Sequence, residues 1–290
     1  MNSDNNVRHP VWLEPFAVPQ FPDPGLYNEQ GLVAIGGDLS PRSLTAAYLQ
    51  GIFPWYQKPP VLWWSPDPRG VIDDQSLHIS RSMRRHLKQL AQDPDLRVCV
   101  TSRIGPVMRA CGAVRESTWI TPEMLYAYGQ LASRGRAHAL EVRRAGALVG
   151  GLYGVRLGGL FAAESMFHVE TDASKVALIA AVLYQFATGT TVFDVQFQTP
   201  HLASMGVYEI SRESYLAELR KLPKASELPE SSASELPRLP PLPALGRPEF
   251  APTVSSILPS FETTEATQLV NEGAFSLELL PWVVERLNLL

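Results

Sequence analysis

The sequence predicts an α+β protein with a mostly antiparallel sheet, and three observations lead to this prediction. The chain has 290 residues, of which 45% are hydrophobic and 19% charged, so it can bury a core of ordinary size. Three strand-like segments, AHALEVRR, ALVGGLYGV and GGLFAAESMF, follow one another from Ala137, and a tight turn at Ala145-Gly146 joins the first two. A helical pattern and a further strand, TVFDVQF, come next, and this order is typical of α+β domains.

The first 70 residues are rich in proline and turns, and we expect them to form a small N-terminal domain. One short helix is expected among these irregular segments. Ser40 can cap this helix, Pro41 suits its first position, and Gly51 suits its end. Residues 71–222 are then expected to form the larger domain.

The segment HISRSMRRHLKQL predicts an amphipathic helix. Ile79, Met83, Leu87 and Leu90 recur at helical spacing and indicate a buried face. The opposite face gathers the basic residues Arg81, Arg84, Arg85 and Lys88. The simpler interpretation is a solvated helix face, and the functional one is contact with nucleic-acid phosphates. The net charge of −4 does not by itself suggest a nucleic-acid binder.

Three more helices are expected along the larger domain. Thr121 and Gly135 bound the first, the second ends at Gly189, and Ser211 caps the third. The apolar run within the second, from Val176 to Ala187, is interrupted by Gln185 and is too short to span a bilayer. The polar N-terminus has no signal-peptide layout, so we expect a soluble, cytoplasmic protein that does not bind membranes.

The two cysteines, Cys99 and Cys111, form no C-x-x-C pair and no cluster with histidine. This argues against a structural zinc site and a disulfide framework, and we expect no metal. The sequence also lacks a P-loop, a G-x-G-x-x-G motif and a G-x-S-x-G elbow. His201 is interpreted as a hydrogen-bonded structural residue.

The strand TVFDVQFQ contains two polar residues that a core strand does not need. Alternation places Phe193 and Val195 on one face, and Val192, Asp194 and Gln196 on the other. One interpretation is a half-buried strand with a wet face. The other is that Asp194 and Gln196 point together into a cleft, where an acid and an amide can handle a proton and a carbonyl.

Other residues are also unusual in their surroundings. Glu164 lies in the apolar stretch LFAAESMF, so its carboxylate needs a partner, either a ligand ammonium group or an Arg or Lys side chain. Four tryptophans lie in turn-rich or helix-entry segments: Trp55, Trp63, Trp64 and Trp119. Each can be a core plug or a platform for a nucleobase. Together with the basic helix, they favour an RNA end over a duplex.

Nine short motifs occur in an order that identifies a family: GLVAIGGDLSP, AYLQGIFPWY, LWWSPDPRGV, HISRSMRR, TWITPEM, GGLYGV, ESMF, DASKVAL and HLASMG. From about residue 12 to residue 220, the sequence closely resembles the bacterial leucyl/phenylalanyl-tRNA–protein transferases. The resemblance implies transfer of Leu or Phe, with Met as a further candidate, from aminoacyl-tRNA to a protein that begins with Arg or Lys. The product is marked for degradation by the N-end rule.

The resemblance also implies an acetyltransferase-like (GNAT-like) larger domain in which aminoacyl-tRNA replaces acetyl-CoA, so that no cofactor is required. Its partners are then aminoacyl-tRNA carrying Leu or Phe and proteins with N-terminal Arg or Lys. We expect a monomer.

The resemblance assigns roles to particular residues. Asp194 and Gln196 correspond to the catalytic pair, and Glu164 to the acid that contacts the donor α-amino group. Trp55 and Trp119 correspond to the pair that sandwiches the terminal adenine. The apolar side-chain pocket corresponds to Leu152, Phe161, Leu178 and Phe193, and the tRNA-binding surface to Arg81, Arg84, Arg85 and Lys88. Phe193 faces opposite Asp194 on a regular strand, so its role requires a twist or bulge.

Two positions depart from the pattern of the family. Ala181 stands where a large aromatic residue can line the pocket, and Ala163 stands where glycine is common. The alternatives are an aminoacyl-tRNA–protein transferase of other specificity, a CoA-dependent N-acyltransferase, and a non-catalytic RNA- or degron-binding protein. In the favoured mechanism, Asp194, directly or through Gln196, draws a proton from the acceptor amine, which then attacks the ester.

Residues 223–290 lie outside the resemblance, and we expect a proline-rich linker and a C-terminal extension of unknown role. Nine prolines fall between Leu222 and Ser260. The final stretch, AFSLELLPWVVERLNLL, is apolar enough to pack, with Pro281 breaking or restarting any helix. A terminal helix that folds back on the domain is the simpler interpretation, and a docking segment for a partner is the alternative.

Overall fold

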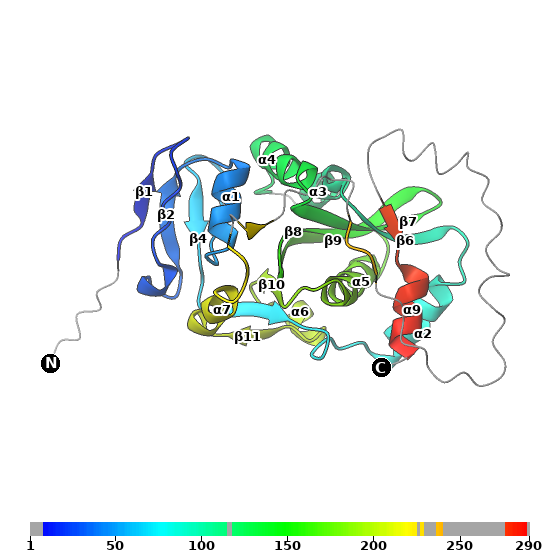
Figure 1. The fold of residues 1–290 in the computed structure, drawn as a ribbon. Helices are drawn as coiled ribbons and strands as arrows, with labels where there is room; N and C mark the ends of the chain where they lie inside the picture. The colour runs from blue at the N-terminus through cyan, green and yellow to red at the C-terminus, as the bar shows by residue number, and fades with distance from the viewer. Residues whose placement is uncertain (1–7, 115–117, 225–226, 229–235, 240–275, 289–290) are drawn as a thin grey trace.

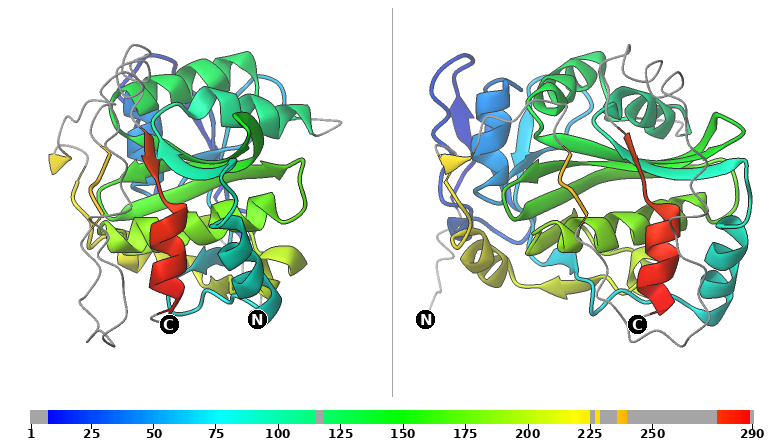
Figure 2. Two further views of the ribbon diagram at one scale, coloured as in Figure 1. Left: turned by 90° about the vertical axis from the view of Figure 1, so that its right-hand side faces the viewer. Right: turned by 45° about the vertical axis from the view of Figure 1, so that its right-hand side comes forward.

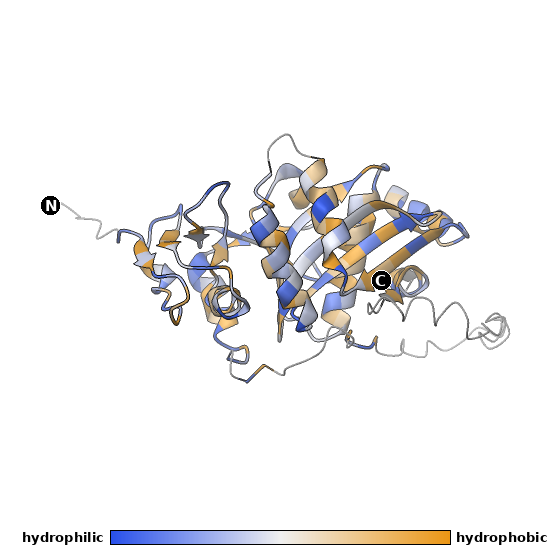
Figure 3. Cartoon of the chain, turned by 90° about the horizontal axis from the view of Figure 1, so that it is seen from above, coloured by the Kyte–Doolittle hydropathy of each residue, from blue (hydrophilic) through white to orange (hydrophobic). Residues whose placement is uncertain are grey.

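Two sheets organise the chain in the computed structural model, which describes residues 8–114, 118–224, 227–228, 236–239 and 276–288 (Figure 1). The smaller sheet has the strand order β1-β2-β4-β3, and the larger has the order β11-β5-β10-β9-β8-β7-β6-β12. Helices and strands are mixed along the chain, so the α+β class is confirmed. Figure 3 shows the smaller N-terminal part at one end, and hydrophobic residues along the strands of the larger sheet.

The N-terminal part contains β1 (Val11–Leu13), β2 (Leu32–Gly36), β3 (Phe53–Pro54), β4 (Leu62–Trp64), a 3-10 helix (Pro24–Leu26) and α1 (Pro41–Tyr48). The predicted cap is confirmed, since the Ser40 side chain accepts a hydrogen bond from the Ser43 backbone N–H. Gly51 has a positive φ of 73°, which glycine adopts without strain, and it follows the end of α1 as predicted.

The larger sheet contains β5 (Arg69–Ile72), β6 (Leu96–Thr101), β7 (Ala137–Arg144), β8 (Ala147–Leu157), β9 (Leu160–His168), β10 (Val192–Gln196), β11 (Tyr208–Ile210) and β12 (Ser276–Glu278). Every neighbouring pair is antiparallel except β9 and β10, which run parallel. The predicted mostly antiparallel character is therefore confirmed, and the sheet is mixed because of this pair. Since β5 begins at Arg69, the proposed boundary at residue 70 falls within a strand of this sheet, and the domain division stays a prediction.

The described α-helices outside the N-terminal part are α2 (Arg81–Leu90), α3 (Ile104–Ala113), α4 (Pro122–Ser133), α5 (Ala173–Ala187), α6 (Pro200–Ser204), α7 (Arg212–Leu219) and α9 (Leu280–Asn288). Helices α3 and α4 cover one face of the larger sheet and α5 covers the other (Figure 2). The hydrophobic core is accordingly divided in two, with α3, α4 and the N-terminal part in one cluster and α2, α5 and α9 in the other.

The predicted helix signals are confirmed at several positions. Thr121 and Ser211 accept backbone hydrogen bonds as N-caps of α4 and α7, and Gly135 and Gly189 have positive φ after α4 and α5. None of the described helices combines the length and hydropathy that crossing a bilayer requires. Over the same residues, no three His, Cys, Asp or Glu side chains form a group that could hold a metal ion.

The C-terminal stretch folds back on the domain, as the simpler interpretation predicted. Strand β12 pairs with the edge strand β6, and α9 restarts the chain as a helix with Pro281 in its first turn. Figures 1 and 2 show this segment in red beside α2. Most of the predicted linker, residues 229–235 and 240–275, lies outside the described residues.

Candidate active site

A pocket opens where the two parallel strands of the larger sheet separate. Strands β9 and β10 pair from Val192–Leu160 to Asp194–Ala162, and beyond that point they no longer form a ladder. A cavity of ≈ 260 Å³ lies beyond the last pair. It is lined by Leu152, Ala163, Glu164, Ser165, Met166, Leu178, Val195, Gln196, Thr199 and Leu202. Aliphatic side chains therefore line the pocket together with polar ones, among which are Glu164 and Gln196.

A bulge in β10 turns Gln196 into this pocket. The register with β5 shifts between Asp194 and Gln196, and Gln196 has a φ of +59°, which is rare for a residue with a side chain. Gln196 therefore lines the same pocket as Val195 instead of facing away from it. Its side-chain Nε2 is buried without a hydrogen-bond partner in the described structure. A strained residue with an unpaired amide is a candidate for contact with a ligand.

Asp194 lies behind the pocket wall and is fully buried. Arg69 donates to it through Nε (2.8 Å to Oδ1) and Nη2 (2.6 Å to Oδ2), which is a bidentate ion pair. The Tyr215 hydroxyl donates to Oδ2 at 2.9 Å, and the Gln196 backbone N–H donates to Oδ1 at 2.8 Å. The prediction that Asp194 and Gln196 point together into a cleft is therefore wrong for Asp194. The carboxylate instead fixes the backbone of the bulge that presents Gln196.

Glu164 is held by two tyrosines. The Tyr48 hydroxyl donates to its Oε1 at 2.6 Å, and the Tyr128 hydroxyl lies 3.3 Å from Oε2 and 2.5 Å from the Tyr48 hydroxyl. In the described part of the chain, Glu164 forms no ion pair with Arg or Lys, so the salt-bridge alternative is not what the structure shows. Burial, chiefly, and the negative charge of Asp194 raise the pKa of Glu164 to about 8. A cation entering the pocket would stabilise the ionised carboxylate.

The apolar residues assigned by resemblance fall into two groups. Leu152 and Leu178 line the pocket. Phe161 and Phe193 pack on each other at 4.9 Å between ring centroids, and both belong to the buried core beneath the pocket. The bulge follows Phe193 in the strand, so it redirects Gln196 and leaves Phe193 on the α5 side.

The aromatic residues near the pocket form a partly exposed group. Trp55 is 45% exposed and contacts Phe197 (5.7 Å between centroids) and Trp64 (6.1 Å). Phe197 follows Gln196 directly and is 43% exposed, which leaves room for a planar ligand on this group. Trp119 is half-buried at the entry to α4 and packs against the first core cluster. Trp63 is a fully buried core residue, as the simpler interpretation has it.

The basic helix α2 presents three of its four predicted tRNA-binding residues to solvent: Arg81, Arg85 and Lys88. Arg84 differs. Its guanidinium donates to the Ile79 carbonyl at 3.2 Å and to the Leu287 carbonyl of α9 at 3.2 Å. The sequence pattern could not separate Arg84 from its neighbours.

Four residues of the site were not identified from the sequence: Arg69, Tyr215, Tyr48 and Tyr128. Each is a buried polar residue that contacts Asp194 or Glu164 from a distant part of the chain. Their only sequence signal is that an acid in an apolar stretch requires a partner. Burial and the neighbouring carboxylates raise the pKa of these tyrosines, so all three act as neutral donors.

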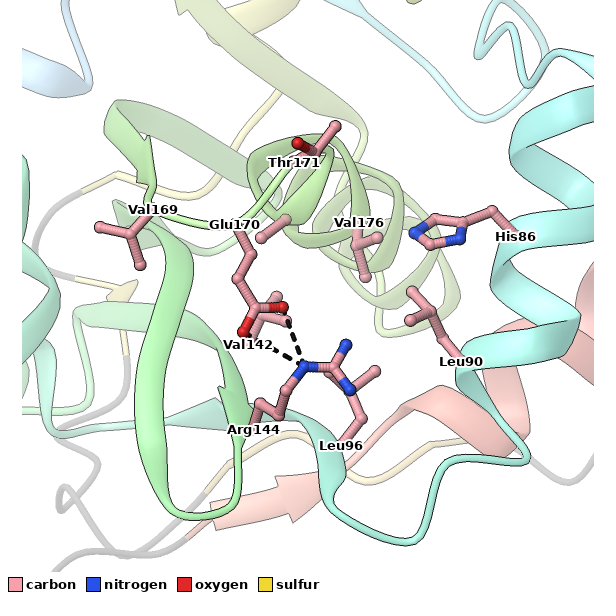
Figure 4. Close-up of a pocket in the computed structure, with 10 residues that line it drawn as sticks. His86, Leu90, Leu96, Val142, Arg144, Val169, Glu170, Thr171 and Val176 are labelled. Atoms are coloured by element: carbon pink, nitrogen blue, oxygen red, sulfur yellow. Dashed lines mark hydrogen bonds and ion pairs between the residues drawn. The ribbon is translucent and has the colours of Figure 1, made fainter.

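A second pocket of ≈ 410 Å³ lies between α2, the β6–β7 edge and the start of α5 (Figure 4). Its cation, Arg144, is paired with Glu170 at 2.9 Å and also with Asp93. Because the Arg144 guanidinium is already paired with two carboxylates, we assign no ligand to this pocket.

Comparison with known proteins matches two regions of the sequence, which together contain most of the site, to one family. The sequence model of the leucyl/phenylalanyl-tRNA protein transferase matches residues 71–220, and that of its N-terminal domain matches residues 37–67. A leucyl/phenylalanyl-tRNA–protein transferase from Tolumonas auensis is 46% identical over 209 residues, which cover 71% of this chain and 88% of that protein. One from Thiobacillus denitrificans is 44% identical over 223 residues, covering 74% and 96%.

A weaker likeness was found to a solved structure, the C-terminal domain of a protein named as a lysylphosphatidylglycerol synthetase from Agrobacterium fabrum. The identity is 13% and the TM-score 0.33, with 59% of this chain and 56% of that chain covered. At this TM-score the likeness carries no argument. The matches of sequence, by contrast, span the pocket, the bulge and α1, and on their strength the chain belongs to the leucyl/phenylalanyl-tRNA–protein transferase family.

Proposed function

We propose that this protein transfers Leu or Phe from aminoacyl-tRNA to the N-terminal Arg or Lys of a protein, and that the peptide bond forms in the pocket between β9 and β10. The transfer from aminoacyl-tRNA to protein is the activity in the name of the family. The observation that supports this location best is the bulge at Gln196, which aims an unpartnered amide into an apolar pocket that also contains Glu164.

The donor amino acid is proposed to occupy the ≈ 260 Å³ cavity. Leu152, Leu178 and Met166 form an aliphatic wall for its side chain, and Phe161 and Phe193 support that wall from the core. Glu164 lies at the polar end and would hold the donor α-ammonium group. An apolar side chain is therefore favoured over a charged one, which would be buried without a partner.

The terminal adenosine is proposed to lie beside the exposed aromatic group, with Trp55 and Trp119 contacting the base. The amino acid is esterified to the terminal ribose, so the base must lie within one nucleoside of the pocket. Trp55 meets this requirement because it packs on Phe197, the neighbour of Gln196. Base stacking of this kind contributes about 1–3 kcal/mol per base. Arg81, Arg85 and Lys88 would contact phosphates farther along the tRNA.

The chemistry requires little beyond positioning, because the ester is already activated. The neutral acceptor amine attacks the ester carbonyl, the new C–N bond forms, the bond to the ribose oxygen breaks, and the amine proton passes to that oxygen. The Gln196 amide N–H is placed to donate to the developing oxyanion. Asp194 acts as a positioning residue, because it contacts Gln196 through the backbone and is enclosed by Arg69 and Tyr215. Direct proton transfer from the acceptor amine to Asp194 does not fit this arrangement, because the carboxylate is enclosed, and the ribose oxygen receives the proton instead.

The acetyltransferase-like architecture expected for residues 71–222 is part of the same proposal. It is supported by the mixed sheet, whose one parallel pair among the described strands separates at the pocket. The cytoplasmic location, the monomeric state and the role in protein degradation remain proposals.

Radiolabelled leucyl-tRNA and a peptide that begins with Arg test this function directly. We expect label to move to the peptide in the presence of the protein, and ribonuclease treatment of the donor to abolish the transfer. Parallel reactions with phenylalanyl-tRNA and methionyl-tRNA give the specificity. Absence of transfer with all three donors, or transfer of an acetyl group from acetyl-CoA instead, would contradict the proposal.

Glu164 leads to a prediction about pH. Because the pKa of Glu164 is raised to about 8, mainly by burial, the carboxylate takes up a proton below this pH and can no longer pair with an ammonium group. Affinity for the donor should therefore weaken by about tenfold per pH unit below 8. Above about pH 8 the donor α-amino group loses its own charge, since its ordinary pKa is about 7.7–8.0. Equilibrium binding of a non-hydrolysable, amide-linked leucyl-tRNA without acceptor measures this profile.

Glu164→Gln is the matched variant for that profile. It should lose the acid limb, because the glutamine amide does not take up a proton in this range. The stability control follows from the same pKa: the folded protein retains a proton that the unfolded chain releases as pH rises from about 4.5 to 8, so Glu164 lowers stability across this window. The Tm of Glu164→Gln at pH 8 should equal or exceed that of the wild type. An acid limb that persists in Glu164→Gln would show that another group binds the donor amine.

A further inference from the structure

The C-terminal segment 276–288, which lies beyond the region matched by the family, is built into the larger sheet. Strand β12 pairs antiparallel with β6 from Ser276–Thr101 to Glu278–Cys99, and the Leu279 N–H donates to the Val98 carbonyl at 2.6 Å. The Glu278 carboxylate in turn accepts a hydrogen bond from the Val98 N–H at 3.0 Å. The segment thus provides hydrogen-bond partners for backbone groups of β6 that would otherwise be unpaired at the edge of the sheet.

Helix α9 completes the packing of this segment. Leu279, Leu280, Val283 and Leu287 are buried, and they share one core cluster with Met83 and Leu87 of α2. Burial of these four aliphatic side chains removes apolar surface from water and keeps the segment docked.

The main consequence of this docking falls on α2. Among the described elements, α9 is the one with which α2 packs most extensively. Figures 1 and 2 show the two helices side by side. Arg84 of α2 adds a polar contact, donating to the Leu287 carbonyl in the last turn of α9. A cation is favourable there, because the terminal carbonyls of a helix have no partners within the helix.

We propose that segment 276–288 is a positioning element for the donor tRNA, which holds α2 so that its outward basic face meets the tRNA beyond the terminal nucleoside. Arg84 has an anchoring role in this arrangement, and Arg81, Arg85 and Lys88 are the exposed cations. The inference rests on the proposed function and concerns only the part of the donor that lies outside the β9–β10 pocket.

Two substitutions, one on the buried face of α9 and one at an exposed position, test the proposal in the full-length chain. Val283→Asp places a charge in the buried face and should undock the segment, whereas Pro281→Asp places the same charge on an exposed position. Each variant is assayed with two donors: intact leucyl-tRNA, and leucyl-adenosine, which ends at the pocket and cannot reach α2.

With intact leucyl-tRNA, Val283→Asp should raise KM at least about tenfold and leave kcat within about twofold, because three phosphate contacts are weakened. With leucyl-adenosine, both constants should stay within about twofold of the wild type, because the pocket is untouched. The dependence of tRNA affinity on salt should also become shallower by up to about 0.9 per lost phosphate contact. Pro281→Asp should match the wild type with both donors.

Glu278→Ala provides a milder second variant in case Val283→Asp fails to fold. It removes the carboxylate contact with Val98 and should produce a smaller change of the same kind. An equal loss with both donors would mean that the segment only stabilises the fold, and unchanged KM for tRNA in a variant with measurably undocked α9 would mean that it has no role in binding. Either result overturns the inference. A wild-type chain that transfers nothing from either donor would instead refute the proposed function.

Discussion

Gln196→Ala should lower kcat for transfer by about 10²–10³, the loss seen when one oxyanion-hole donor is removed. The side-chain Nε2 of Gln196 is buried and has no hydrogen-bond partner among the described residues, so its removal leaves no acceptor there unsatisfied. The KM for leucyl-tRNA should change by less than about threefold, because the contact is made mainly in the transition state. Single-turnover rates with saturating donor measure this loss.

Gln198→Ala is the matched control for this prediction. Gln198 is the same residue type two positions on, and its amide is engaged by the Val207 carbonyl at 2.7 Å, away from the pocket residues. Its kcat should remain within about threefold of the wild type. A comparable loss in both variants, or a Gln196→Ala enzyme that keeps its rate but needs more donor, would remove Gln196 from the chemical step.

Arg69→Met should destabilise the fold by about 3–5 kcal/mol, because it leaves the buried Asp194 carboxylate without its ion-pair partner. Both side chains are at most 1% exposed, so water cannot substitute for the guanidinium. The expected fall in Tm is roughly 6–20 °C for a domain of this size.

Asp194→Asn keeps the shape of the side chain, and we expect it to lower the chemical rate while donor binding stays largely intact.

The double variant Arg69→Met/Asp194→Leu separates stability from activity. With both charges removed, the desolvation cost disappears, and at least half of the lost stability should return. Transfer activity should not return, because the Gln196 N–H then lacks its carboxylate acceptor and the bulge is no longer fixed. Recovery of activity along with stability would show that the ion pair has a structural role only. Urea denaturation and single-turnover transfer on the same preparations measure the two quantities.

Local patterns of the sequence were sufficient to predict much of the fold. Helix α2 follows from four apolar residues at helical spacing, and the caps at Ser40, Thr121 and Ser211 follow from side-chain chemistry within a few residues. The β7–β8 hairpin follows in the same way from its Ala145-Gly146 turn. The motifs of the family then assigned roles to Glu164 and Gln196. Strand alternation and apolar neighbours alone had shown only that these two residues are unusual in their surroundings.

The partners of those residues could not be found by such means. Arg69 lies 125 positions from Asp194, and Tyr48 lies 116 positions from Glu164, so only the tertiary fold brings them together. The alternation rule also fails at the bulge, because it assumes a regular pleat and Gln196 has a positive φ. The same limit applies to β12, whose partner β6 is about 180 residues earlier in the chain.

The contact between Tyr48 and Glu164 has a consequence for how members of this family can be recombined. Helix α1 comes from the N-terminal part, yet its last residue, Tyr48, donates to the carboxylate at the polar end of the pocket. The Gly51 carbonyl, just after α1, likewise accepts a hydrogen bond from Arg69, the partner of Asp194. A chimera that joins the N-terminal part of one relative to the remainder of another therefore combines contact partners from two different proteins. It will work only if the graft preserves these two contacts, so the N-terminal part is not an interchangeable module.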